Sequence, residues 1–133
     1  MAWETPKTNW NKTDRINYRD YNRIKNNLSW LRDMAGKLYQ EFNIVADPDK
    51  SNYSSRPYAS EINHLEENLE TIRSHTYPFE TGQTRTYYGN APTIDWQALN
   101  RLESACKLIH DNLQGQEEGK RRLSFRLGGM KGL

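Results

Sequence analysis

Apolar residues recur at intervals of three and four along residues 16–42, a spacing that predicts a long amphipathic helix. An α-helix has about 3.6 residues per turn, so this spacing places the whole set on one face. Asn17 is a suitable N-cap, and Asp20 follows near the positive end of the helix dipole. The pattern therefore predicts a first helix over residues 17–42, with this apolar stripe: Tyr21, Ile24, Leu28, Leu31, Ala35, Leu38 and Phe42.

Two later segments repeat the same period and predict two further helices. Residues 58–75 have an acidic front half and end in Arg73 and His75, as the helix dipole favours. Residues 95–114 begin at Asp95, a suitable N-cap, and are followed by Gly115, a residue type that commonly ends a helix. The predicted stripe of the second helix is Ile62, Leu65, Leu69 and Ile72, and that of the third is Leu99, Leu102, Cys106, Ile109 and Leu113, thickened by Ala105 and Leu108.

Two short segments have the features of strands. Residues 84–88 are rich in Thr and Tyr and precede Gly89, and residues 122–127 alternate polar and apolar side chains. A lone two-stranded pair is marginal in water, so we expect these strands to pair with each other, with another subunit, or with both. The predicted fold is mainly α: one domain over residues 1–133, with a three-helix bundle and a small two-stranded β appendage.

Residues 1–15 show no helical period and are predicted to form an extended N-terminal arm. Trp3 and Trp10 flank Pro6 within it, and a flexible polar arm has no need of two tryptophans. The tryptophans either fold back onto the bundle or dock on another chain. The sequence leaves both alternatives open.

An internal repeat links the three helices. Asn22, Asn63 and Asn100 each lie between apolar residues at the same place in the pattern, although asparagine is a poor helix former. Each amide either bonds a loop backbone or a neighbouring helix, or the three form a shared polar binding site. The first interpretation is favoured, because buried amides usually satisfy local backbone groups. In either case the three helices have equivalent roles.

The composition points to assembly with a partner. Hydrophobic residues make up only 35% of the chain, so the core is small and part of the stability is expected to come from contacts with other chains. The net charge is +2, and residues 114–133 carry five basic and two acidic side chains, or +3, so the remainder sums to −1. The candidate protein-interface residues are Trp3, Trp10, Tyr77, Phe79, Tyr87, Tyr88, Arg121, Arg122, Phe125 and Arg126.

Sequence motifs for catalysis or cofactor binding are absent. The chain lacks a G-x-x-x-x-G-K-[ST] loop and a G-x-S-x-G elbow. The spacing of His64, His75 and His110 fits no metal-ligand set, and Cys106, the single cysteine, lies on an apolar stripe typical of a core. No apolar run approaches the roughly 18 residues of a membrane span, and the N-terminus lacks the features of a signal peptide. We expect no enzyme, no metal and no cofactor.

Several short stretches together resemble a known group of proteins. They are Asp20-Tyr21-Asn22-Arg23-Ile24, Asn27-Leu28, residues 58–68 and Leu99-Asn100-Arg101-Leu102-Glu103, with Trp3, Pro6 and Trp10 ahead of the first helix. The chain resembles small structural proteins encoded in the tail and baseplate region of phages and prophages of Gram-positive bacteria.

The resemblance implies a virion structural or adaptor protein of the tail tip, baseplate or fibre-attachment region. Its partners would be other tail or baseplate proteins and copies of itself, without a small-molecule substrate. It would lie in the phage tail after assembly in the bacterial host cytoplasm. No catalytic residue comes with the resemblance. Two alternatives are left open. One is a nucleic-acid-associated helical protein that uses the basic C-terminal tail, although nucleic acid would favour a larger basic surface than this. The other is a host-directed regulator made by a phage.

Overall fold

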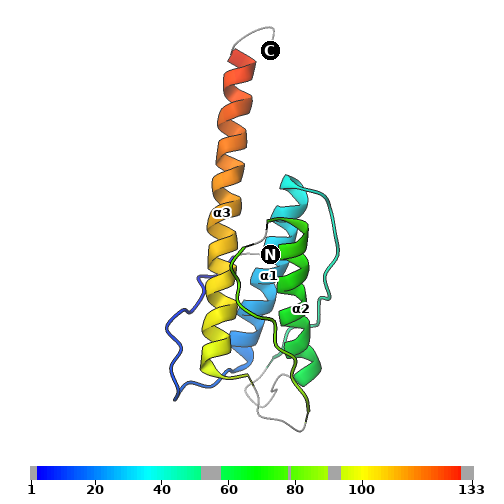
Figure 1. Ribbon diagram of the computed structural model, residues 1–133, viewed down its shortest axis with the longest axis vertical. Helices are drawn as coiled ribbons and strands as arrows, with labels where there is room; N and C mark the ends of the chain where they lie inside the picture. The colour runs from blue at the N-terminus through cyan, green and yellow to red at the C-terminus, as the bar shows by residue number, and fades with distance from the viewer. Residues whose placement is uncertain (1–2, 52–57, 78, 90–93, 130–133) are drawn as a thin grey trace.

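The chain folds as a bundle of three helices, α1 (Tyr18–Leu38), α2 (Ala59–His75) and α3 (Trp96–Gly129). The computed structural model describes residues 3–51, 58–77, 79–89 and 94–129, and side chains as far as Gly119. Each helix contacts the other two. The helices run parallel, and the connecting segments return along the outside of the bundle (Figure 1). The predicted mainly helical fold with three packed helices is therefore confirmed.

The first helix begins where the sequence predicts and ends four residues early. The Asn17 side chain accepts a hydrogen bond from the Asp20 N–H, and the Asp20 side chain accepts one from the Asn17 N–H, which completes a capping box. The helix ends at Leu38 instead of residue 42, and the chain leaves the helix axis at Tyr39. This departure lets Phe42 stack on His75 at the end of α2, with ring centroids 4.5 Å apart.

The predicted β appendage is wrong. Helix α3 does not stop at residue 114 but continues through Gly115 and Gly119 to Gly129, so residues 122–127 are helical. Residues 84–88 are not a strand either, and none of the described residues is. Extending a formed helix adds a local hydrogen bond with each residue, whereas an isolated strand pair is marginal. The Gln and Glu residues after Gly115 also favour the helix.

The predicted stripes form the core. Leu28, Leu31, Leu102, Ile109 and Leu113 are all 0% exposed. The exceptions are Leu38 and Phe42, which are only partly buried against the core, and Leu108, which is 43% exposed and does not thicken the stripe of α3. The core also includes Trp10 from the arm and Phe79 from the segment before α3. Within the part of the chain that the structure describes, no helix combines the length and apolarity needed to cross a membrane.

Candidate functional site

Asparagine side chains fasten the connecting segments to the helices. The Asn22 Nδ2 donates to the Lys50 carbonyl at 2.8 Å, and the Lys50 N–H donates back to Asn22 Oδ1 at 2.8 Å. The amide thus satisfies both backbone groups of Lys50, as a neighbouring strand would. Four more asparagines pair with one backbone residue in the same two-bond way: Asn27 with Glu4, Asn63 with Tyr87, Asn68 with Val45 and Asn100 with Trp10.

These bonds decide between the two interpretations of the asparagine repeat. Asn22, Asn63 and Asn100 hold Lys50, Tyr87 and Trp10, which belong to three different segments. The amides therefore do not converge on a shared polar site. Each bonds the backbone of a non-helical segment that is distant in sequence, and their equivalent positions give the three helices equivalent roles.

The repeat closes into a ring of three units, each a non-helical segment followed by its helix. The segment before α2 is bonded at Val45 to its own helix, through Asn68, and at Lys50 to the preceding helix, through Asn22. The N-terminal arm, residues 3–10, is bonded at Glu4 to its own helix, α1, through Asn27. Its Trp10 is bonded to Asn100 of the last helix, so the first unit closes the ring on the third.

The third unit departs from this pattern in the contact between its non-helical segment and its own helix, α3. Position 105, which matches Asn27 and Asn68 in the repeat, is an alanine. Arg101 replaces the missing amide by donating from Nη1 to the Thr81 carbonyl at 3.1 Å. Gly82 follows with φ of +76°, and a Cβ there would collide with the Arg101 side chain. The glycine therefore permits both the turn and the close approach of the guanidinium.

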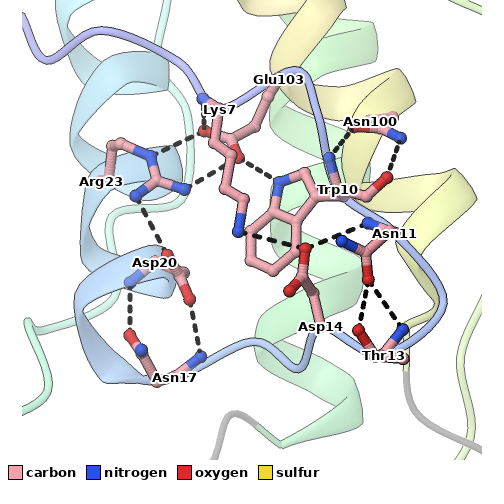
Figure 2. Close-up of polar contacts among 10 residues, drawn as sticks. All are labelled: Lys7, Trp10, Asn11, Thr13, Asp14, Asn17, Asp20, Arg23, Asn100 and Glu103. Carbon is pink, nitrogen blue, oxygen red and sulfur yellow. Dashed lines mark hydrogen bonds and ion pairs between the residues drawn. The ribbon is translucent and has the colours of Figure 1, made fainter.

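A buried charged side chain lies three positions after each asparagine of the repeat, Asn22, Asn63 and Asn100. The side chains are Lys25, Glu66 and Glu103, and both glutamates are 1% exposed. Glu103 accepts hydrogen bonds from Arg23 Nε at 2.7 Å and Nη2 at 2.8 Å, from Trp10 Nε1 at 2.5 Å and from the Lys7 N–H at 3.0 Å (Figure 2). This carboxylate therefore joins α1, α3 and the arm in one network.

The two other helix pairs of the ring, α3 with α2 and α2 with α1, use the equivalent positions of the repeat. Arg101 Nη2 of α3 contacts both carboxylate oxygens of Glu66 on α2. Between α2 and α1 the expected carboxylate is replaced by a cation, Lys25. Two aspartates of the connecting segment supply the missing charge there: Asp49 pairs with Lys25, and Asp47 Oδ2 lies 2.6 Å from His64 Nδ1.

Burial and charge shift the titration of groups inside this ring. Burial on its own would lower the pKa of Arg23, but the hydrogen bonds and charges of Glu103 and Asp20 raise it instead. The guanidinium therefore stays charged against its carboxylate partners. In the core, burial raises the pKa of the Cys106 thiol. A neutral, buried thiol is a poor nucleophile, in agreement with the placement of Cys106 on the apolar stripe.

The six interface candidates whose side chains are described separate into three groups. Trp10 and Phe79 are buried, with 3% and 4% exposure, so neither is free on the surface of this chain. Trp3 stacks on His110 with ring centroids 4.0 Å apart, and Tyr87 is half-buried. Tyr77 and Tyr88 are exposed, at 59% and 65%. The side chains of Arg121, Arg122, Phe125 and Arg126 lie outside the described residues.

Sequence reasoning missed the charged ring. Arg23, Glu66, Arg101 and Glu103 were not predicted as site residues, although the aligned repeat contains a signal for them. Extending the alignment beyond each asparagine shows a basic or histidine residue one position later and a charged residue three positions later. Charged residues are seldom fully buried unless they are paired, so two charged positions that recur in every unit are candidates for ion pairs between helices.

Comparison with known proteins does not assign this arrangement to a family. No protein-family model, no curated protein and no solved structure matches the chain significantly. Among the described residues, no three His, Cys, Asp or Glu side chains are grouped so that they could hold a metal ion.

We expect the folded chain to lose stability at alkaline pH because the half-buried Tyr87 hydroxyl ionises. Burial, followed by the nearby Glu66 carboxylate, raises the pKa of Tyr87 to about 12. The unfolded value is about 10, so the neutral hydroxyl stabilises the fold below pH ~10, and that contribution disappears as the pH approaches ~12. Melting temperatures measured across this range should fall less for Tyr87→Phe than for the wild type. Tyr88→Phe, at the exposed neighbour, should follow the wild type, and equal slopes for all three proteins would contradict the prediction.

Proposed function

We propose that this chain is a structural or adaptor protein of a phage virion, at the tail tip, baseplate or fibre-attachment region, and acts by protein–protein assembly. The resemblance of its helix motifs to tail-region proteins of Gram-positive phages supports the proposal. The proposed role includes no catalytic step. Partners are other tail or baseplate proteins and further copies of the chain.

The observation that carries the proposal is the length of α3. It has 34 residues, against 21 in α1 and 17 in α2. At 1.5 Å per residue this is about 51 Å, against about 32 Å for α1. The C-terminal part of α3 accordingly projects beyond the ends of the other helices (Figure 1). A single helical extension gains little stability in water, so a partner that packs against it is the simplest reason for its presence.

Removal of residues 120–133 tests the proposal. The truncated chain should keep the thermal melt of the bundle, because the described core ends at Leu113. It should no longer be incorporated into phage particles, as judged by mass spectrometry of purified virions. Wild-type protein that is absent from purified particles would contradict the virion assignment and favour a regulator of the host.

A second candidate function is binding of nucleic acid. It is favoured by the position of Lys120, Arg121, Arg122 and Arg126, which fall on the projecting part of α3 and not on an edge strand. A projecting basic helix can approach a DNA groove. DNA affinity that falls steeply with salt, and is lost when residues 120–133 are removed, would favour this function over tail assembly.

A further inference from the structure

The N-terminal arm occupies a site built from side chains of two other segments. This site, here named the arm site, consists of Asn27 on α1 with Asn100 and Glu103 on α3. The two other non-helical segments, before α2 and before α3, are connected to helices at both of their ends. Among the described residues, the arm joins the helices through residues 11–17. It can therefore leave its site without breaking the path of the chain through the helices.

The arm site recognises mainly the backbone. Asn27 bonds the N–H and carbonyl of Glu4, Asn100 bonds those of Trp10, and Glu103 accepts from the Lys7 N–H. The one arm side chain that is enclosed is Trp10, whose Nε1 donates to Glu103. On the side of the arm, all of these contacts are made by residues 4, 7 and 10. An arm of the same sequence from a second copy of the chain would form every one of them.

The linker between arm and α1 has the properties of a hinge. Asn11, Thr13 and Arg15 are exposed. The hydrogen bonds of Asn11 and Thr13 are with each other and with Asp14, and Asp14 pairs with Lys7 at 3.2 Å. Straightening residues 11–15 breaks these local bonds and leaves the Asn17 capping box in place. Five extended residues can span roughly 16–18 Å, which lets the arm reach toward an adjacent molecule.

We propose that two copies of this chain exchange N-terminal arms, so that each arm fills the arm site of the other copy. The proposal rests on the assembly role above and identifies the partner as a second copy. Exchange of an identical element needs no new complementary surface, which makes it a low-cost route to a dimer. Because the contacts are the same within one chain and between chains, the concentration of the protein determines which form dominates.

A complementation experiment tests the exchange. Glu4→Pro/Lys7→Pro removes two arm N–H donors and leaves the arm site intact, whereas Asn27→Leu/Asn100→Leu disables the site and leaves the arm intact. Each full-length variant alone and an equimolar mixture of the two variants are unfolded and refolded at high concentration. The products are then analysed by native mass spectrometry and sedimentation. Wild type should form dimers. Each variant alone should have a dimer dissociation constant at least about tenfold higher than that of wild type. The mixture should give a heterodimer of one copy each, because one exchange remains intact.

Matched controls keep this result interpretable. Thr8→Pro places the same residue in the arm at an exposed position for which the described structure gives no hydrogen bond, and it should dimerise like wild type. A fluorescent peptide of residues 3–12 gives an independent measurement. It should bind the Glu4→Pro/Lys7→Pro variant, whose arm site is intact. If that variant does not fold, an excess of the peptide should bind wild type instead. The peptide should not bind Asn27→Leu/Asn100→Leu.

Two outcomes would overturn arm exchange. One is wild-type protein that remains monomeric after refolding at high concentration. The other is a wild-type dimer whose two variants do not complement each other, since a different surface would then join the copies. Neither outcome decides the assembly role, which the removal of residues 120–133 tests separately.

Discussion

Replacing Glu103 with alanine is expected to destabilise the folded chain by about 3–5 kcal/mol, the usual cost of breaking a buried ion pair from one side. Glu103 is 1% exposed and accepts from Arg23, from the Trp10 indole and from the Lys7 N–H. Without the carboxylate, both N–H groups lose their acceptor and the guanidinium keeps only Asp20, in a place that water reaches poorly. Urea unfolding followed by circular dichroism measures the change.

Three comparison variants separate charge from packing. Glu103→Gln keeps one acceptor oxygen and should have an intermediate effect. Arg23→Met/Glu103→Leu removes both charges and should cost less than Glu103→Ala, because no buried charge is left unpaired. Glu67→Ala, at an exposed position of α2, should change stability by less than about 0.5 kcal/mol. A Glu103→Ala protein within about 1 kcal/mol of wild type would show that the ring of charges does not support the fold.

Helix positions were predictable because burial leaves a periodic trace in the sequence. Nearly all the stripe positions became core, and Asn17 and Asp95 cap the helices as expected. The C-terminal segment was not predictable in this way. Leu123, Phe125 and Leu127 alternate like a strand, yet Leu123 and Leu127 are also four residues apart, as in a helix. With so short a segment, local continuation of α3 outweighed the apparent alternation.

The candidate site was predictable only in part. The repeated asparagines could be found, because an unfavourable helix residue at equivalent positions requires a cause. Their partners could not be found, because Lys50, Tyr87 and Trp10 are recognised through backbone atoms that any residue carries. The pairing of α1 with α3 through Arg23 and Glu103 likewise depends on the order of helices around the ring. Amino-acid periodicity does not encode that order.

Leu28→Asp is expected to unfold the bundle. Leu28 is 0% exposed at the centre of the α1 stripe, so the carboxylate would have to be buried without a partner or be exposed by opening the core. Either response costs more than about 4 kcal/mol, a large part of the stability of a typical domain. Circular dichroism and size-exclusion chromatography should show loss of the cooperative melt and an expanded chain, and Leu69→Asp on α2 should behave alike.

The matched control for this substitution is Leu108→Asp. It introduces the same charge into a helix at a leucine that is 43% exposed, where water solvates the carboxylate, and it should melt within a few degrees of wild type. The contrast between the two leucines therefore tests the burial pattern independently of helix propensity, since Leu→Asp lowers that propensity at both sites. A folded, fully helical Leu28→Asp protein would mean that α1 does not supply the centre of the core, and the three-helix arrangement would have to be abandoned.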